Sequence, residues 1–201
     1  KKIFLPKIKW ITTQRKDNKT SGLMGLKEML EENNLDAKNV LKPDIFWLSS
    51  DVETLLKKNK ITSKYILLLP GSSKNHSSKR WPYFSEFARY LILKKYKVVI
   101  ILGPEELELE QSMPGYILKD LDWFQLSGII EKSSFVIGND SGPSHIASCL
   151  NKNGFALFGP STSAKRSGLK RGNFDILKTA DLNSLTVDKV FKKMIEDLKE
   201  K

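Results

Sequence analysis

From residue 64 onward, short runs of consecutive apolar residues alternate with longer segments whose apolar positions recur at helical spacing. The continuous runs predict strands, which we place at residues 65–69, 97–102, 135–137 and 155–158. The helical spacing predicts helices, which we place at residues 81–95, 122–132, 143–150 and 187–198. Strands that lack polar alternation are buried on both faces, which is typical of a parallel sheet covered by helices. The pattern therefore predicts a doubly wound, Rossmann-like α/β fold.

Residues 1–60 lack this alternation and mix basic runs with Asn-rich, turn-prone stretches. Apolar residues at helical spacing predict a helix over residues 22–33, and the apolar run 45–48 predicts a strand. A Ser-x-x-Glu pattern within residues 50–59 resembles a capping box and predicts a second helix there. We therefore expect two parts, with residues 1–60 as the tail of another unit and residues 61–201 as the α/β domain.

Composition narrows the classes of partner. A chain of 201 residues suffices for one α/β domain with a smaller piece, and its apolar runs are too short for a membrane-spanning helix. The net charge of +11 favours anionic partners such as nucleotides, phosphorylated sugars, nucleic acid or an acidic membrane surface, although scattered surface lysines explain it equally well. Cys149 cannot form an internal disulfide, which suits a reducing compartment, and we interpret it as a buried small residue. The start at Lys1, without a signal-peptide pattern, is compatible with a fragment.

Four loops that follow the predicted strands carry most of the candidate chemistry. In a parallel sheet these loops meet at one edge, where ligands bind. Residues 70–82 combine a glycine and several hydroxyl residues with Lys79 and Arg80 before a helix, which suits a phosphate or, alternatively, a flexible solvated loop. In the second loop, Glu105 can accept hydrogen bonds from two neighbouring ribose hydroxyls, or it can simply favour a helix N-terminus.

The third loop, residues 138–145, is the most specific. Asp140 or Ser141 can cap the next helix, and Gly142 permits close approach of a ligand to free N–H groups that suit a pyrophosphate. His145 lies on the first turn of that helix, within reach of a phosphate oxygen or of the loop itself. Asp140 carries the wrong charge for a phosphate, so its alternatives are sugar hydroxyls or helix capping. The fourth loop, residues 159–166, repeats the combination of small and basic residues.

Several other classes of site are disfavoured. No Gly-x-Gly-x-x-Gly pattern follows a strand and no Walker-type loop occurs, which argues against dinucleotide and P-loop sites. Only His76 and His145 are present, together with one cysteine, so no metal site is expected.

These residues together resemble glycosyltransferase family 9, the heptosyltransferases of lipopolysaccharide core assembly and their relatives. The resemblance lies in four ordered blocks between residues 65 and 160. The blocks are Leu-Pro-Gly-Ser with Lys-Arg-Trp-Pro, Ile-Leu-Gly-Pro-Glu, Val-Ile-Gly-Asn-Asp-Ser-Gly-Pro-Ser-His-Ile-Ala, and Ala-Leu-Phe-Gly-Pro-Ser.

The resemblance implies a GT-B architecture, in which this chain supplies the C-terminal, donor-binding domain of an inverting enzyme that uses an ADP-activated heptose without a cofactor or a required metal. It implies that Lys79 stabilises charge on the leaving nucleotide. The donor-binding residues that it implies are Ser72, Lys79, Glu105, Asp140, Ser141, Gly142 and His145. The acceptor site and the general base belong to the other domain, which residues 1–60 are too short to contain.

We therefore expect a glycosyltransferase that binds a nucleotide-sugar and an anionic glycolipid or glycan acceptor. We expect it in the cytoplasm or peripherally on the inner face of the inner membrane. The alternatives are a truncated, inactive module that binds a nucleotide or an anionic glycan, and a nucleic-acid-binding protein that the positive charge alone motivates.

Overall fold

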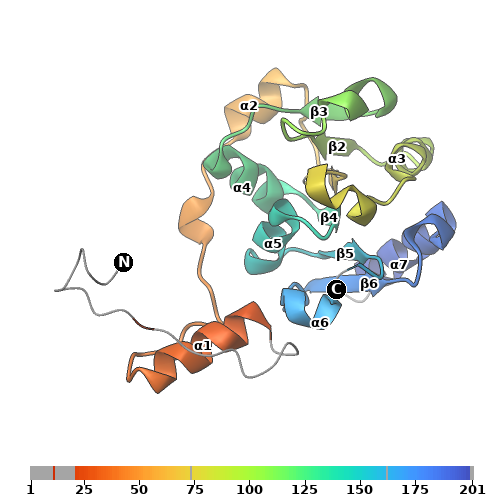
Figure 1. The fold of residues 1–201 in the computed structure, drawn as a ribbon. Coiled ribbons are helices and arrows are strands. Elements are labelled where there is room, and N and C mark those ends of the chain that lie inside the picture. Colours follow the sequence, from red (N-terminus) through yellow and green to blue (C-terminus); the bar gives the residue numbers. More distant parts are fainter. Residues whose placement is uncertain (1–10, 12–20, 73, 162, 200–201) are drawn as a thin grey trace. The chain divides into compact units, whose positions relative to one another are not determined.

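A computed structural model describes residues 11, 21–72, 74–161 and 163–199 (Figure 1). The described residues form two compact units. The first contains the described residues up to Pro43 together with Lys165–Gly168, and its longest element is helix α1 (Gly22–Glu32), which Ser21 caps. The second unit contains Asp44–Ala164 and the described residues from Leu169 onward, and it holds the sheet.

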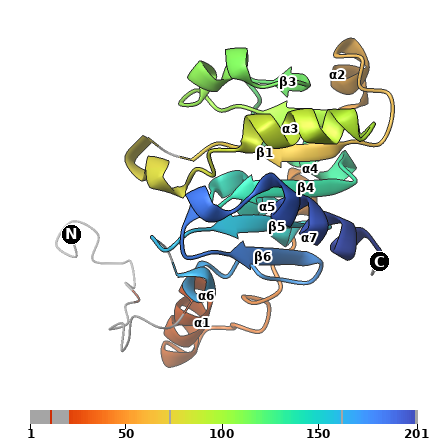
Figure 2. The same ribbon diagram turned by 90° about the vertical axis from the view of Figure 1, so that its right-hand side faces the viewer.

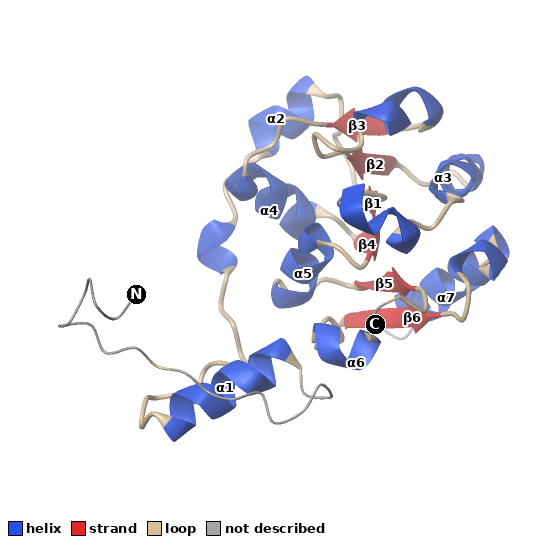
Figure 3. Ribbon diagram, in the orientation of Figure 1, coloured by secondary structure: helices blue, strands red, loops and turns tan. Residues whose placement is uncertain are grey.

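The second unit is built on one six-stranded sheet in the order β3-β2-β1-β4-β5-β6, with every neighbouring pair parallel (Figure 3). Its strands are β1 (Ile66–Leu69), β2 (Val98–Ile101), β3 (Tyr116–Leu118), β4 (Phe135–Asn139), β5 (Gly154–Phe158) and β6 (Phe174–Lys178). This topology confirms the predicted doubly wound α/β fold. The strands run outward from β1 to β3 in one direction and from β4 to β6 in the other, so the strand order reverses between β1 and β4.

Helices cover both faces of the sheet, and each face has its own core (Figures 1 and 2). The elements besides α1 and the strands are α2 (Glu53–Lys58), α3 (Phe84–Leu93), α4 (Trp123–Lys132), α5 (Gly142–Cys149), α6 (Ala164–Ser167), α7 (Val187–Lys199) and the 3₁₀ helices Phe46–Leu48, Lys74–Lys79, Leu107–Ser112 and Leu182–Ser184. Leu67 and Leu69 of β1 pack with α4 and α5, whereas Ile66 and Leu68 pack with α3 and α7. Since successive side chains of a strand point to opposite faces, an unbroken apolar run fills both cores.

The sequence pattern found the four central strands and missed the two edge strands. Strands β1, β2, β4 and β5 are buried throughout, as their continuous apolar runs predicted. Strands β3 and β6 pair on one side only and are partly exposed. An edge strand needs fewer apolar residues, so its run is short or interrupted by polar positions.

Three local predictions were wrong. The run 45–48 forms a 3₁₀ helix at Phe46–Leu48 instead of a strand. Helix α2 begins at Glu53, and its N-cap residue Val52 makes no side-chain capping bond. The Glu53 N–H donates to the Asp51 carboxylate at 2.9 Å, so Ser50 forms no capping box. Helix α3 begins at Phe84, later than predicted, because Trp81 is buried and its indole N–H donates to the Leu185 carbonyl at 2.8 Å.

Candidate functional site

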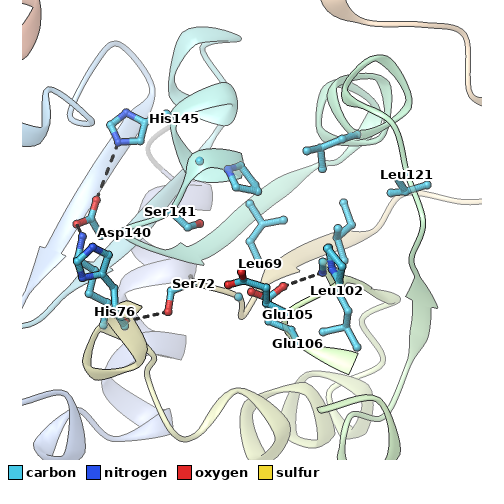
Figure 4. Close-up of a pocket in the computed structure, with 18 of the residues that line it drawn as sticks. Leu69, Ser72, His76, Leu102, Glu105, Glu106, Leu121, Asp140, Ser141 and His145 are labelled. Atoms are coloured by element: carbon cyan, nitrogen blue, oxygen red, sulfur yellow. Dashed lines mark hydrogen bonds and ion pairs between the residues drawn. The ribbon is translucent and has the colours of Figure 1, made fainter. Parts of the chain in front are cut away.

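A pocket of about 750 Å³ opens beyond the carboxyl ends of β1, β2 and β4 (Figure 4). Three of the four predicted loops line it, and so does the segment between β3 and α4. The lining residues are Leu69, Gly71, Ser72, His76, Lys79, Ile101, Leu102, Gly103, Pro104, Glu105, Glu106, Asp120, Leu121, Trp123, Leu126, Asp140, Ser141, Gly142, Pro143 and His145.

The N-terminus of α5 forms one wall of the pocket. Pro143 occupies the first turn, where its missing N–H costs no hydrogen bond, and Ser141 is the N-cap residue without a side-chain capping bond. The Ser141 Oγ atom is buried and has no hydrogen-bond partner among the described residues. A buried hydroxyl without a partner is costly, and the helix N-terminus beside it carries partial positive charge. This wall therefore has donors available for an anionic group.

Lys79 and Asp140 form an ion pair across the pocket, with the ammonium nitrogen 2.8 Å from a carboxylate oxygen. Both side chains are largely buried, at 18% and 8% exposure, which makes the attraction stronger than at a surface. His145 Nε2 lies 4.0 Å from the other oxygen of the same carboxylate. Asp140 thus faces two basic side chains and does not cap α5.

Burial lowers the pKa of His145 below its ordinary value, and the neighbouring cations Arg171 and Lys79 act in the same direction, whereas Asp140 opposes them. The imidazole is therefore neutral near pH 7 in the absence of a ligand. In this form one ring nitrogen donates and the other accepts a hydrogen bond.

The loop between β1 and α3 is fastened at both ends by one buried side chain. The buried side chain of Asn139, at the end of β4, donates from its amide nitrogen to the Pro70 carbonyl at 2.7 Å. Its amide oxygen accepts from the backbone N–H of Trp81 at 3.0 Å. The backbone carbonyl of Asn139 accepts from the Ser144 hydroxyl at 2.7 Å. Asn139 therefore holds the first loop against the start of α5.

Arg80 connects the first loop to the second and does not line the pocket. Its guanidinium donates to the Ser72 carbonyl at 2.7 Å and to the Ser72 hydroxyl at 3.3 Å. It also pairs with Glu106 at 3.6 Å and with Glu108 at 3.0 Å. The Ser72 hydroxyl in turn donates to the His76 carbonyl at 3.1 Å, so its hydrogen-bonding capacity is already used inside the loop.

Glu106 is the buried carboxylate of the second loop, whereas the sequence pointed to Glu105. Its side chain accepts from the Gly103 N–H at 2.7 Å and lies against Gly71. A Cβ atom on Gly71 would lie 2.6 Å from the Glu106 carboxyl carbon, so any larger residue there would require the Glu106 carboxylate to move. Glu105 also lines the pocket (Figure 4).

The opposite end of the pocket is mainly apolar. The aliphatic side chains there come from the ends of β1 and β2, from the segment before α4 and from α4 itself, and they are Leu69, Ile101, Leu102, Leu121 and Leu126. Trp123 is 62% exposed and Asp120 stands beside this surface. Together these groups can accept a flat, partly polar ring.

The structure brings all seven predicted donor-site residues into this single pocket. The fourth loop behaves differently, because no described residue of 159–166 lines it. Sequence reasoning missed Glu106, Asn139 and Trp123. Among the described residues, no group of three His, Cys, Asp or Glu side chains could hold a metal ion.

The parallel sheet and the position of the pocket define the class of protein. The pocket lies where the strand order reverses, between β1 and β4, which is the general ligand site of doubly wound α/β proteins. The chain belongs to glycosyltransferase family 9 (heptosyltransferase), whose family model matches residues 27–189. This match confirms the resemblance seen in the sequence.

Three relatives illustrate the similarity. Lipopolysaccharide heptosyltransferase 1 of Campylobacter coli is 29% identical over an alignment of 177 residues, which covers 78% of this chain and 50% of the relative. The family 9 glycosyltransferase of Veillonella parvula superposes with a TM-score of 0.78 at 20% identity, covering 99% of this chain and 66% of that one. Heptosyltransferase WaaC of E. coli with ADP gives a TM-score of 0.66 at 18% identity, covering 92% and 59%. These structures share the fold, and the chain spans about half the length of the curated relative.

Proposed function

We propose that this chain is the donor-binding half of an inverting, heptosyltransferase-like glycosyltransferase and that its pocket holds an ADP-activated sugar. The observation that carries the proposal is the α5 N-terminus, which lines the pocket together with Lys79 and whose N-cap residue, Ser141, has a buried hydroxyl without a partner among the described residues. Hydroxyl, helix N-terminus and ammonium are three donors suited to a diphosphate. The similarity to a heptosyltransferase with ADP supports this choice of nucleotide.

The pocket is divided in a way that matches the parts of such a donor. We assign the diphosphate to Ser141, Gly142 and Lys79, and the ribose hydroxyls to the carboxylates Glu105 and Glu106. The apolar end beside Trp123 suits the base, since aromatic and aliphatic surfaces bind rings by stacking and burial. Asp140 and His145 complete the sugar and phosphate contacts, whereas Ser72, whose hydroxyl is bonded within the loop, shapes the phosphate side of the pocket.

Charge development explains how these residues assist transfer. When the sugar leaves the nucleotide, negative charge grows on the diphosphate, and a fixed cation stabilises that charge more than it stabilises the intact donor. Lys79 takes this role by exchanging Asp140 for phosphate oxygens, after which Asp140 is free to accept from sugar hydroxyls. The base that activates the acceptor lies outside the residues assigned to this site.

The acceptor and the cellular location belong to the proposal as well. We propose an anionic lipopolysaccharide-type glycan as acceptor and a cytoplasmic enzyme that meets it at the membrane surface. The relative from Campylobacter coli and the net charge of +11 support this view. No helix among the described residues is long and apolar enough to span a membrane.

A second candidate is a module that binds the donor nucleotide without transferring the sugar. The site is compatible with it, since the residues assigned above bind the donor and none of them is assigned as the base. The two candidates share the binding site and differ in turnover. Release of ADP from an ADP-heptose donor in the presence of a lipopolysaccharide-type acceptor supports the enzyme, and binding without release supports the module.

Calorimetric titration with ADP tests the binding site. We expect the wild-type chain to bind ADP and Lys79→Ala to bind at least roughly tenfold more weakly, because a charge-assisted hydrogen bond contributes ~1.5–3 kcal/mol. Lys64→Ala serves as the control, since Lys64 is exposed before β1, at the opposite edge of the sheet. A folded wild-type chain that does not bind ADP would contradict the proposal, as would equal affinity in Lys79→Ala.

A further inference from the structure

Arg80 holds together two neighbouring loops that line the pocket, the one after β1 and the one after β2. Arg80 lies near the end of the first loop, before α3. Its guanidinium reaches the hydroxyl and carbonyl oxygens of Ser72 and the carboxylates of Glu106 and Glu108. It also lies 3.4 Å from the Glu105 carbonyl. The side chain is 18% exposed and lies behind the pocket wall, whereas its neighbour Lys79 faces the pocket.

We propose that Arg80 is a positioning residue, which fixes the phosphate-binding and ribose-binding sides of the pocket relative to each other without contacting the nucleotide. The proposal rests on the proposed function of the pocket. The sequence alone placed Arg80 beside Lys79 as a second basic group for a phosphate. The structure gives the two cations different surroundings and therefore different tasks.

The geometry of the guanidinium explains why an arginine suits this place. Its planar fork carries five N–H donors, so one side chain can bond a carbonyl, a hydroxyl and two carboxylates at once. Lysine offers a single ammonium on a flexible stem and cannot span the same acceptors. Asn139 anchors the first loop from the side of β4, and Arg80 anchors it from the side of β2. Loss of Arg80 therefore removes one of the contacts that hold Ser72 and the Glu106 carboxylate in place.

Titration with two ligands separates positioning from direct phosphate binding. Adenosine probes the base and ribose ends alone, whereas ADP adds the diphosphate. For Arg80→Ala we expect the dissociation constants of both ligands to rise roughly tenfold. For Lys79→Ala we expect a rise for ADP only. Hydrogen exchange should quicken within residues 70–82 of Arg80→Ala and stay unchanged in β4 and β5, which distinguishes a local effect from general unfolding.

Two further variants complete the test. Arg89→Ala removes the same charge from the exposed face of α3, where Arg89 donates to the Ser112 carbonyl at 3.3 Å, and it should bind both ligands like wild type. Arg80→Lys keeps the charge and should restore neither affinity.

Each remaining outcome is decisive. If Arg80→Ala weakens ADP but not adenosine, or if Arg80→Lys restores binding, Arg80 acts through its charge and the inference is overturned. Unchanged affinity for both ligands overturns it as well. A wild-type chain that binds neither ligand overturns the proposed function itself, and with it this inference.

Discussion

Gly142 is a position where a substitution should affect ligand binding without disturbing the fold. It is the first residue of α5 and lines the pocket, and a Cβ atom added to it would meet no protein atom within 4 Å. The space beside it is therefore open in the empty site. In our account the diphosphate occupies that space, because the free N–H groups of the helix point there.

Gly142→Ala should accordingly keep the fold and weaken ADP. We expect stability equal to wild type or up to about 1 kcal/mol higher, since alanine is the better helix residue. We expect the affinity for ADP to fall, because the methyl group takes the place of the ligand. Thermal denaturation and calorimetry on the same sample measure both effects.

Gly71→Ala provides the contrasting control. Its Cβ would lie 2.6 Å from the Glu106 carboxyl carbon, so it should cost stability by about 1–3 kcal/mol, as overpacking does. Full ADP affinity in Gly142→Ala would place the diphosphate elsewhere.

A site residue could be predicted from the sequence only where its position relative to a strand determines the direction in which its side chain points. Residues directly after a central strand, such as Asp140 and Ser141, face the rim whatever the details of packing. The sequence analysis named Glu105 and not Glu106, because which of the two carboxylates is buried depends on the turn leading into the 3₁₀ helix Leu107–Ser112. It also gave Arg80 the same task as Lys79, since their opposite directions depend on tertiary contacts.

At the scale of elements, an acidic side chain on β6 joins that edge strand to α7. Asp175 accepts from Lys193 of α7 at 3.2 Å and pairs with Lys170 at 2.8 Å, while Lys193 also bonds Asp197 at 2.6 Å. Burial tends to raise the pKa of Asp175, but hydrogen bonds from Lys170, the Ile176 N–H and Lys193 outweigh it and lower the pKa to about 2. The folded state therefore favours the ionised carboxylate.

This linkage predicts how stability depends on pH. Because the pKa of Asp175 is lower in the folded chain than its ordinary 3.8, its contribution is complete above about pH 4 and disappears as the pH falls toward 2. Asp175→Asn should cost about 1 kcal/mol or less at pH 7, given the partial exposure of the group, and should lose less stability than wild type between pH 4 and 2. Urea denaturation at pH 7, 4 and 2.5 measures this difference.

Glu196→Gln on the exposed face of α7 is the control and should follow the wild-type curve. Parallel pH profiles for Asp175→Asn and wild type would show that the cluster contributes nothing to acid sensitivity.

The elements themselves were predictable in proportion to their burial. The four central strands are buried throughout, so they appear in the sequence as continuous apolar runs. In strand β6 the polar Asp175 interrupts the apolar run after Phe174, and β3 has three residues, so neither stands out. The start of α3 was misplaced because Trp81 and Tyr83 fit helical spacing, although Trp81 packs against Phe84 and Phe87 from a turn before the helix.

At the scale of the whole molecule, the sheet unit contains every residue that we assign to the donor. Its two cores cover both faces of the sheet, and the pocket is formed entirely within Asp44–Ala164. The division between residues 1–60 and 61–201 stays a prediction, and the compact sheet unit itself begins at Asp44. Donor binding can therefore be examined with this chain, while transfer requires an acceptor and a base.

A crystal structure of the chain with ADP tests the central claim most directly. We predict the diphosphate at the N-terminus of α5, within hydrogen-bond distance of the Ser141 hydroxyl and the Gly142 N–H. Lys79 should have moved from Asp140 to a phosphate oxygen, and the base should lie against Leu121 and Trp123. ADP bound outside this pocket, or a diphosphate inside it that leaves the Lys79 to Asp140 ion pair intact and the Ser141 hydroxyl unpartnered, would contradict the account.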